Sequence, residues 1–297
     1  MKYVGLNGAI VEEDKAVISI LDHGFLYGIG LFETFRTYGG VPFLLKQHLE
    51  RLSEACEQLG IIVQLDSEFI IAHIRELLNA NGLQDGYVRF SVSAGSQPLG
   101  LPTEDYEQPN IIVYVKSLPS TGMLEGKALQ VLRLRRNTPE GQYRTKSFHY
   151  MNNILAKREM SAYAWAKHAE GLFLDQEGNI AEGIVSNLFF VRDGVLYTPS
   201  IDIGILPGIT RAHVLQLAKQ EDIRVVEGKF PLKQLCEAEE IFITNSIQEL
   251  ISIQVIYNEQ GEQVWLVRSG SGSGSCSCTE RLKTAYRSSI EAEMQRS

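Results

Sequence analysis

The sequence predicts a two-domain protein of the α/β (α+β) class, with a small N-terminal α/β domain and a larger C-terminal α/β domain. The chain has 297 residues, 44% hydrophobic and 22% charged, which is a globular composition longer than the roughly 100–200 residues of one typical domain. Strand-like apolar runs alternate with amphipathic helical patterns, without an obvious βαβ repeat. The turn-rich segment PSTGMLEGK divides the chain, so we expect domains at 1–118 and 128–297 joined by 119–127.

Strand patterns dominate the N-terminal part. Short apolar runs between turn formers predict strands, and Gly39-Gly40 between two such runs predicts a hairpin. The expected strands are YVGLNGAIV (3–11), AVISIL (16–21), LFETFRTYGGVPFLL (31–45), YVRFSVSAG (87–95) and NIIVYVKSL (110–118).

Two helices are expected to cover these strands. Residues 46–59 repeat apolar side chains at helical spacing and stop before Gly60, a typical C-cap residue. Residues 67–80 have an N-cap candidate in Asp66 or Ser67.

The C-terminal part mixes both kinds of element. The expected strands are 128–137, 171–175, 187–199, 224–230, 240–246 and 251–257, and the expected helices are 147–168, one beginning at Gly208, and 279–294. The tract SGSGSGSCSC at 269–278 predicts a flexible linker. Cys276 and Cys278 within it have no matching His or Cys cluster, so we expect no metal site.

Charge and cysteine usage narrow the classes of function. The 28 Lys+Arg and 36 Asp+Glu give a net charge of −8, which argues against a broad surface for nucleic acid or an anionic membrane. Four scattered cysteines indicate a reducing compartment. No secretory signal and no run near the ~20 apolar residues of a membrane span occurs, so we expect a cytoplasmic protein.

Two segments are suited to binding an anion. LPGITR (206–211) opens a helix whose first N–H groups and Thr210 hydroxyl can hold an anion. FITNS (242–246) ends a buried-looking strand in three hydrogen-bonding side chains. Taken alone, an ordinary helix start and an ordinary strand end are the more common explanations.

Two further segments carry a candidate lysine and a candidate acid. RTKSFHYMNN (144–153) places Lys146 among aromatic and amide residues, a setting in which amine nucleophiles occur, although most lysines are merely solvated. NIAEGIVSNLFF (179–190) places Glu182 before an apolar strand, where a buried carboxylate needs a cationic partner.

Together with LDHGFLYGIGLFETFRTYGG (21–40) and KQHLERL (46–52), these four segments resemble the fold-type IV pyridoxal-phosphate enzymes. That family includes branched-chain aminotransferases, D-amino-acid aminotransferases and aminodeoxychorismate lyase. The resemblance runs from about residue 3 to about residue 257 and ends before the Gly/Ser/Cys tract. It implies a pyridoxal 5′-phosphate cofactor at the domain interface and a homodimer whose neighbouring subunit completes the site.

The resemblance also implies roles for individual residues. Lys146 corresponds to the Schiff-base lysine, Glu182 faces the pyridine nitrogen, and the Tyr150 phenol hydrogen-bonds the cofactor's 3-oxygen. The residues implied to bind the phosphate are Arg51, Ile209, Thr210 and Ser246. A carboxylate at the ring nitrogen keeps it protonated and sets the strength of the electron sink, and the freed lysine amine is the natural base.

Three segments, FETFRTYGG, KSFHYMNNILAKRE and ITNS, resemble the lyases more than the aminotransferases. The expected reaction is therefore conversion of 4-amino-4-deoxychorismate into 4-aminobenzoate and pyruvate for folate biosynthesis, with Lys146 transferring the protons. The alternative is a branched-chain or D-amino-acid aminotransferase that uses the same cofactor site.

A substrate with two carboxylates needs fixed cations, ideally arginines that bind in bidentate fashion. The candidates are Arg36, Arg89 and Arg144, and Tyr27 is expected to line the pocket. His23 and His149 are expected to be structural.

Two other classes are less favoured. In a nucleic-acid-binding protein, Arg133 and Arg135 would share one strand face while Arg136 points away, so no continuous basic stripe forms. A scaffold that has lost catalysis is disfavoured because Lys146 and Glu182 are both present.

Overall fold

The computed structural model describes residues 1–119, 126–267 and 277–295. These residues form two compact units. The first contains Met1–Pro119, Thr145–His149 and the residues from Ile290 onward, and the second contains the remaining residues up to Ser289. The division differs from the expected single break, because two segments of the expected C-terminal domain cluster with the first unit. Most of the expected connection lies outside the described residues.

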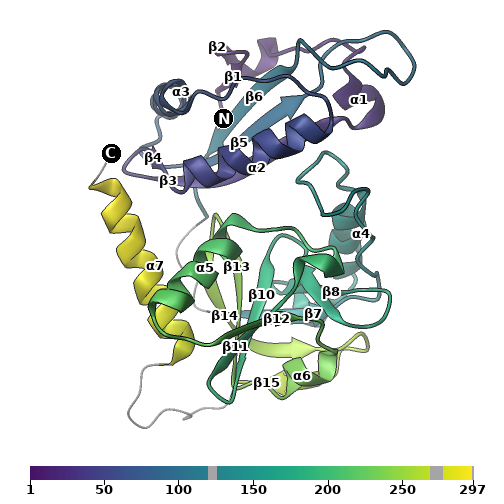
Figure 1. Ribbon diagram of the computed structural model, residues 1–297, viewed down its shortest axis with the longest axis vertical. Coiled ribbons are helices and arrows are strands. Elements are labelled where there is room, and N and C mark those ends of the chain that lie inside the picture. Colours follow the sequence, from purple (N-terminus) through teal and green to yellow (C-terminus); the bar gives the residue numbers. More distant parts are fainter. Residues whose placement is uncertain (120–125, 268–276, 296–297) are drawn as a thin grey trace. The chain divides into compact units, whose positions relative to one another are not determined.

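The first unit is built on an antiparallel sheet with strand order β2-β1-β6-β5-β3-β4 (Figure 1). Gly39 and Gly40 form the turn between β3 and β4 as predicted, and both adopt a positive φ that favours glycine. The strands are β1 (Tyr3–Leu6), β2 (Ala9–Glu12), β3 (Gly30–Tyr38), β4 (Val41–Pro42), β5 (Tyr87–Ser93) and β6 (Asn110–Lys116).

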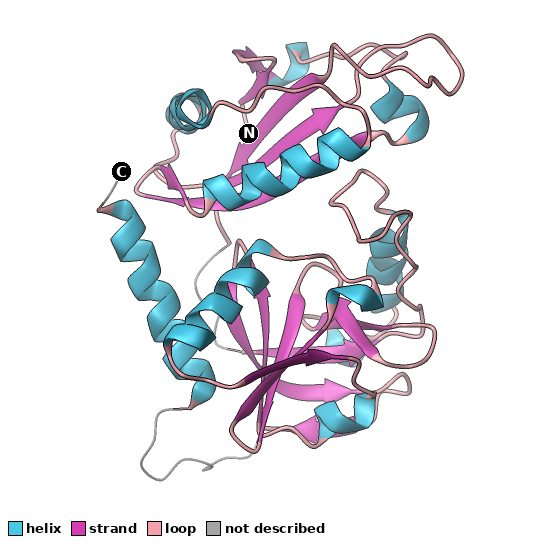
Figure 2. Ribbon diagram, viewed as in Figure 1, coloured by secondary structure: helices cyan, strands magenta, loops and turns pink. Residues whose placement is uncertain are grey.

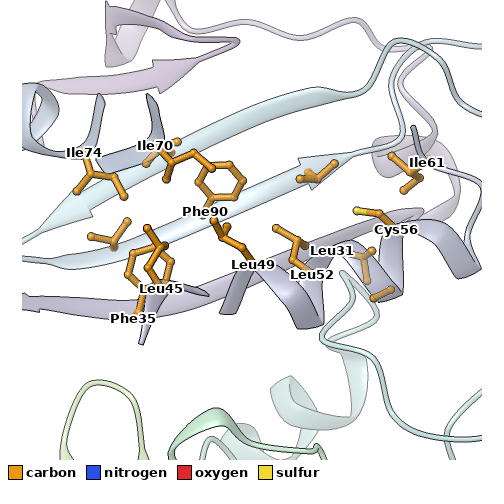
Figure 3. Packing of buried hydrophobic residues seen from close by; sticks show 14 of the residues in the cluster. Leu31, Phe35, Leu45, Leu49, Leu52, Cys56, Ile61, Ile70, Ile74 and Phe90 are labelled. Atoms are coloured by element: carbon orange, nitrogen blue, oxygen red, sulfur yellow. The ribbon is translucent and has the colours of Figure 1, made fainter. Parts of the chain in front are cut away.

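Helices α2 (Leu45–Gln58) and α3 (Ser67–Ala80) cover one face of this sheet. Figure 3 shows their apolar side chains packed against Leu31, Phe35 and Phe90 from the strands. Both helices match their predicted ranges within a residue, because the 3.6-residue apolar period is a local signal. The face of the sheet turned away from α2 and α3 is therefore the one left for other contacts.

The predicted strand at 16–21 does not form. The short 3-10 helix η1 (Glu13–Lys15) precedes it, and residues 16–20 lie outside strands and helices. The side chains of Val17 and Ile20 are both 76% exposed. The apolar residues of this segment lie on the surface of the unit, and a short helix, α1 (His23–Tyr27), follows them.

The second unit is built on a mixed sheet with strand order β12-β11-β10-β13-β14-β7-β8-β9, and β15 pairs with β14 (Figure 2). β9 at one end of this order also contacts β10, so the sheet curls back on itself. The strands are β7 (Lys127–Val131), β8 (Glu170–Leu174), β9 (Ile180–Gly183), β10 (Asn187–Arg192), β11 (Val195–Pro199), β12 (Val225–Gly228), β13 (Glu240–Asn245), β14 (Glu249–Tyr257) and β15 (Gln263–Leu266). β9 and β15 were not predicted.

The helices of the second unit are mostly short. They are α4 (Met151–Met160), η3 (Ala164–Ala166), η4 (Ile201–Ile203), α5 (Ile209–Gln220), α6 (Leu232–Cys236) and α7 (Cys278–Met294), whose last residues cluster with the first unit. The helix predicted over 147–168 is therefore shorter and begins later than expected. The strand predicted over 128–137 ends at Val131.

Helix α7 has a side-chain cap from a distant strand. The carboxylate of Glu240 on β13 accepts hydrogen bonds from the backbone nitrogens of Cys278 at 3.0 Å and Thr279 at 2.8 Å. Leu282 and Tyr286 on this helix are buried. The predicted linker at 269–278 lies outside the described residues except for its last two positions. Among the helices in the described ranges, none is long and apolar enough to cross a membrane.

Candidate active site

The segment that carries Lys146 is bound to β3 through its main chain. The Phe32 nitrogen donates to the Lys146 carbonyl at 2.9 Å, and the Phe148 nitrogen donates to the Gly30 carbonyl at 2.9 Å. A Cβ at Gly30 would lie 2.3 Å from the Phe148 ring, so glycine permits this close approach. This pairing explains why the helix predicted from 147 begins only at Met151.

The Lys146 amine lies over an aromatic ring that also contacts an arginine. Its Nζ is 4.7 Å from the centre of the Phe32 ring, and Cζ of Arg89 is 3.5 Å from the same centre. Arg89 also donates from Nε to Ser91 Oγ at 3.2 Å. A cation against a ring face is attracted by the ring's quadrupole. Phe32 thus brings two of the predicted site residues together.

Arg36 lies on the same face of the sheet. Side chains alternate along a strand, so Phe32 and Arg36 on β3 point away from the α2 and α3 face. Thr34 pairs with Arg89 across β3 and β5, which makes Arg36 and Arg89 diagonal neighbours about 7–8 Å apart. Two arginines therefore share a sheet face with the ring that the Lys146 amine contacts.

Arg51 on α2 is bound to a buried acid, Glu33, that the sequence analysis did not select. Its Nε donates to Glu33 Oε1 at 2.8 Å and its Nη2 to Glu33 Oε2 at 2.5 Å. His48 Nδ1 lies 2.6 Å from Glu33 Oε2. The alternation of the strand could have identified Glu33 from the sequence, because it is the one charged residue in the core-facing row of β3, between Leu31 and Phe35.

Tyr27 ends α1, and its hydroxyl accepts a hydrogen bond from the Gly100 nitrogen at 3.0 Å. His23 on the same helix is fully buried, with one ring nitrogen 3.0 Å from the Tyr106 hydroxyl and the other 3.1 Å from the Pro98 carbonyl. These contacts tie the α1 turn to the loop between β5 and β6. His23 has the contacts of a structural histidine, whereas His149 is exposed with Nε2 3.3 Å from the Tyr27 carbonyl.

Glu182 on β9 is a buried carboxylate held by several donors. Oε1 accepts from Arg136 Nε at 2.8 Å and lies 3.7 Å from Arg144 Nε. Oε2 accepts from the Leu206 backbone nitrogen at 2.9 Å and from Asn187 Nδ2 at 3.4 Å. Charged and hydrogen-bonding partners of this kind are what a buried anion requires.

Arg144 differs from its predicted role as a substrate-binding residue. Its Nε donates to the Gly204 carbonyl at 2.7 Å, and its Nη2 donates to the Asn137 carbonyl. The guanidinium is therefore bound to backbone carbonyls close to Glu182. Burial lowers the pKa of Arg144 to about 10. Tyr150, at the N-cap of α4, interacts electrostatically with Arg144, so it belongs to the same cluster.

Thr210 and Ser246 lie together at the start of α5. Their hydroxyl oxygens are 3.2 Å apart. Gly208 is the N-cap, and a Cβ there would lie 2.0 Å from Asn187 Oδ1, so a larger residue would displace the Asn187 amide. Ile209 is the first helical residue, and the helix N-terminus with two hydroxyls has the donors that a phosphate group needs.

The predicted residues are divided between the two units. Lys146, Arg36, Arg51, Arg89 and Tyr27 belong to the first unit, and Glu182, Arg144, Tyr150, Ile209, Thr210 and Ser246 belong to the second. The cofactor site between domains stays a prediction.

The disfavoured nucleic-acid surface would use Arg133, Arg135, Arg136 and Arg144, and three of these lie beside acidic partners. Arg136 and Arg144 lie beside Glu182, and Arg135 Nη1 is 3.0 Å from Glu259 Oε1. The role of Arg136 was not predicted, because its partner is distant along the chain.

The chain is similar to known proteins in sequence and in structure. The family model "Amino-transferase class IV" matches residues 30–256. The chain is 40% identical over 288 residues to the aminodeoxychorismate lyase of Bacillus subtilis, covering 96% of this chain and 94% of that one. It is 30% identical over 264 residues to the D-alanine aminotransferase of Staphylococcus epidermidis, covering 87% and 90%.

A solved structure of the branched-chain aminotransferase from Thermoproteus uzoniensis with norvaline matches with a TM-score of 0.83 at 27% identity, covering 97% of this chain and 94% of that one. The sequence match, the structural match and the site residues lead to one conclusion: the chain belongs to the class IV aminotransferase family.

Proposed function

We propose that this protein is a pyridoxal-phosphate-dependent lyase that converts 4-amino-4-deoxychorismate into 4-aminobenzoate and pyruvate. The observation that carries the proposal is that the Lys146 amine and the Arg89 guanidinium both contact the Phe32 ring on one face of the sheet. The lysine would act as the base, and the arginine would bind an anionic group of the substrate. The 40% identity to a lyase of this name supports the choice of reaction.

The residues present fit the cofactor that the family uses. The aldehyde needs a primary amine, which Lys146 offers, and the pyridine nitrogen needs an anion, which Glu182 offers within a shell of donors. The phosphate needs N–H and O–H donors, which the start of α5 with Thr210 and Ser246 offers. Arg51 adds a guanidinium.

When bound, the cofactor supplies an electron sink for the bond that breaks next to the substrate nitrogen. Glu182 would stabilise the protonated ring nitrogen. Arg136 donates to the same carboxylate and so keeps it in place as an anion. The strength of the sink is thereby set by side chains of the second unit.

Lys146 moves the proton in this proposal. Its amine removes the proton from the amine-bearing carbon of the substrate, and the electron pair left behind expels the enolpyruvyl oxygen by breaking the C–O bond. The ring becomes aromatic, which drives the step. Lys146 then returns a proton to the methylene carbon of the departing enolpyruvate, which gives pyruvate, and no amino acceptor is consumed.

Arg36 and Arg89 are the arginines best suited to the two substrate carboxylates. Each lies on the sheet face that carries Phe32, and a guanidinium fork pairs with a carboxylate in bidentate geometry. Tyr27 remains our candidate for a pocket wall. Arg144 is better suited to holding Glu182.

The second candidate is an aminotransferase that acts on branched-chain or D-amino acids. It is favoured by the TM-score of 0.83 to a branched-chain aminotransferase, since the lysine and the acid would serve both reactions. It would consume a keto acid, whereas the lyase would not.

The deciding experiment is to incubate the purified, cofactor-loaded protein with enzymatically generated aminodeoxychorismate and to measure 4-aminobenzoate and pyruvate. Equal amounts of both products without a keto acid support the lyase. Glutamate formation from an amino acid and 2-oxoglutarate, without 4-aminobenzoate, would select the aminotransferase. Lys146→Ala should abolish either activity, and Lys46→Ala, at an exposed lysine, serves as the control.

We also propose that the protein is a homodimer. Exposed apolar side chains on two segments of the first unit support this assembly, because exposed apolar patches are typical of interfaces. These residues, which we call the apolar patch, are Val17, Ile18, Ile20, Leu21, Phe25, Leu99 and Leu101. The Gln97 nitrogen donates to the Leu21 carbonyl, so the two contributing segments lie together.

Light scattering after gel filtration tests this assembly. Ile20→Asp should give a monomer, whereas Ile62→Asp, at an exposed residue outside the patch, should leave the dimer intact. A monomeric wild-type protein would refute it. A cytoplasmic location stays a prediction.

A further inference from the structure

The acid of the first unit, Glu33, lies in an unusual place. It occupies the core-facing row of β3 between Leu31 and Phe35, whose packing against α2 is visible in Figure 3. The Glu33 side chain is 1% exposed. An ionised carboxylate is costly to bury without partners, so its presence in an apolar row calls for a specific reason.

Two side chains of α2 satisfy this carboxylate. Arg51 donates from Nε and Nη2 to its two oxygens at 2.8 and 2.5 Å, and His48 Nδ1 lies 2.6 Å from Oε2. His48 and Arg51 are three residues apart, so they share one face of the helix. One strand residue therefore binds two consecutive turns of α2.

The protonation states of the cluster are consistent with this hydrogen bonding. Burial raises the pKa of Glu33, but the Arg51 guanidinium and the His48 hydrogen bond outweigh it and lower that pKa to about 2. Burial lowers the pKa of His48, although Glu33 opposes this. Glu33 is thus an anion, and it accepts the hydrogen bond from Nδ1–H of His48.

Exposure differs along the cluster. The side chains of Glu33 and His48 are 1% exposed, whereas that of Arg51 is 15% exposed. A guanidinium is planar and has five donors in fixed positions, so a carboxylate bound along its Nε and Nη2 edge also fixes the direction of Nη1. The buried pair therefore fixes the direction in which Nη1 of Arg51 points.

We infer that Glu33 and His48 are positioning residues that fix the plane of the Arg51 guanidinium for binding a phosphate monoester, the 5′-phosphate of the cofactor. The inference rests on the proposed function, because that proposal assigns the phosphate to Arg51. It adds a support layer behind the phosphate site, in the way that hydrogen-bonded partners orient other binding side chains.

The test compares two ligands that differ only in the phosphate. Apo-protein is titrated with pyridoxal 5′-phosphate and with pyridoxal, and the dissociation constants are read from the absorbance of the lysine-bound ligand. In Glu33→Gln and His48→Phe we expect pyridoxal phosphate to bind about tenfold to a hundredfold more weakly, with pyridoxal changed less than threefold, since hydrogen bonds to charged groups have this magnitude. His48→Gln, which keeps a donor, should restore most of the affinity.

Asp22→Asn is the matched control. Asp22 is another fully buried carboxylate of the first unit. It accepts hydrogen bonds from the Gly24 nitrogen at 2.7 Å and Asn110 Nδ2 at 2.7 Å, and within the described part of the chain it has no arginine partner. It should lose stability without changing the ratio of the two dissociation constants. Should Glu33→Gln fail to fold, the two His48 variants carry the test.

Arg51→Lys separates failure of the inference from failure of the proposed function. If this variant leaves the ratio unchanged, Arg51 does not bind the phosphate and the cofactor assignment of Arg51 is wrong. If Arg51→Lys weakens the binding of pyridoxal phosphate relative to pyridoxal, but the Glu33 and His48 variants leave this preference unchanged as Asp22→Asn does, the two buried residues are merely structural. The inference is then overturned. Selective loss of pyridoxal phosphate binding in all three positions supports it.

Discussion

Two buried carboxylates, one in each unit, contrast in how they are bonded. Glu33 receives its charged partner and its histidine from one helix, three residues apart, and leaves the arginine partly exposed. Glu182 receives donors from Arg136, from Asn187 and from the Leu206 backbone, which are far apart in the sequence. In the first cluster the acid orients an arginine. In the second cluster arginines and amides orient the acid.

This difference teaches that burial and an arginine partner do not reveal the role of an acid. In the first cluster Arg51 is the most exposed member, so it is our candidate for touching a ligand. In the second cluster the side chains of Arg136 and Glu182 are 7% and 5% exposed, so exposure does not separate them, and the choice of Glu182 follows from the proposed function.

The largest effect is expected from Glu182→Gln. Loss of the anion at the ring nitrogen should reduce kcat by about 10²–10³-fold, because electrostatic stabilisation of developing charge has this magnitude. Glu33→Gln should change cofactor affinity much more than kcat at saturating cofactor. The measurement is 4-aminobenzoate formation at several cofactor concentrations. Equal losses of kcat in the two variants would show that Glu182 and Glu33 do not differ in role.

The next effect concerns the arginines around Glu182. Arg136→Gln removes the 2.8 Å donor from a buried anion and should lower the free energy of unfolding by about 3 kcal/mol. The neighbouring Arg135→Gln is the control, because its pair with Glu259 is about one third exposed and is expected to contribute at most about 1 kcal/mol. Urea denaturation of both variants checks this. Similar losses would mean that Glu182 does not depend on Arg136.

The pH dependence of stability distinguishes the first cluster. The pKa of Glu33 is about 2 in the folded protein against an ordinary value of 4.5, so its stabilisation is complete above that ordinary value and is lost as the pH falls from 4.5 towards 2. The full amount is on the order of 3 kcal/mol. The difference in unfolding free energy between wild type and Glu33→Gln should shrink between pH 5 and pH 3 in denaturation experiments. A constant difference would show that Glu33 is not ionised.

The smallest effect is expected on the opposite face of β3 from Glu33. Phe32→Leu removes the ring that contacts both Lys146 and Arg89, and cation–π contacts contribute about 0.5–2 kcal/mol. We expect kcat/KM to fall about threefold to tenfold, while cofactor affinity stays near that of wild type. Phe32→Tyr keeps the ring and should behave as wild type. If Phe32→Leu lowered cofactor affinity as much as Glu33→Gln does, the two faces of β3 would not have separate roles.

Local signals were sufficient for several elements of the fold. The periods of α2 and α3, the Asp66 cap and the Gly39-Gly40 turn depend on neighbouring residues, and the structure has them where they were predicted. The segment at 16–21 has the apolar composition of a strand, but no strand pairs with it. Its composition cannot show whether apolar residues are buried within the unit or left on its surface.

Elements that depend on distant partners were predicted less well. Residues 147–150 continue a helical pattern in the sequence, yet the main chain at Lys146 and Phe148 pairs with β3, more than a hundred residues earlier. The resemblance to a family selected Lys146 and Glu182, whose roles stay predictions. It did not identify Glu33 or Arg136, because their importance depends on partners that meet only in the folded chain.

The main-chain bonds between the Lys146 segment and β3 have a consequence for how enzymes of this kind diversify. Backbone pairing does not depend on which side chains surround the amine, provided that position 30 stays small. The walls of the pocket can therefore mutate without displacing Lys146, the lysine that we propose as the Schiff-base residue. Natural selection, or a protein engineer, can retarget such a scaffold to a new substrate by exchanging wall residues alone.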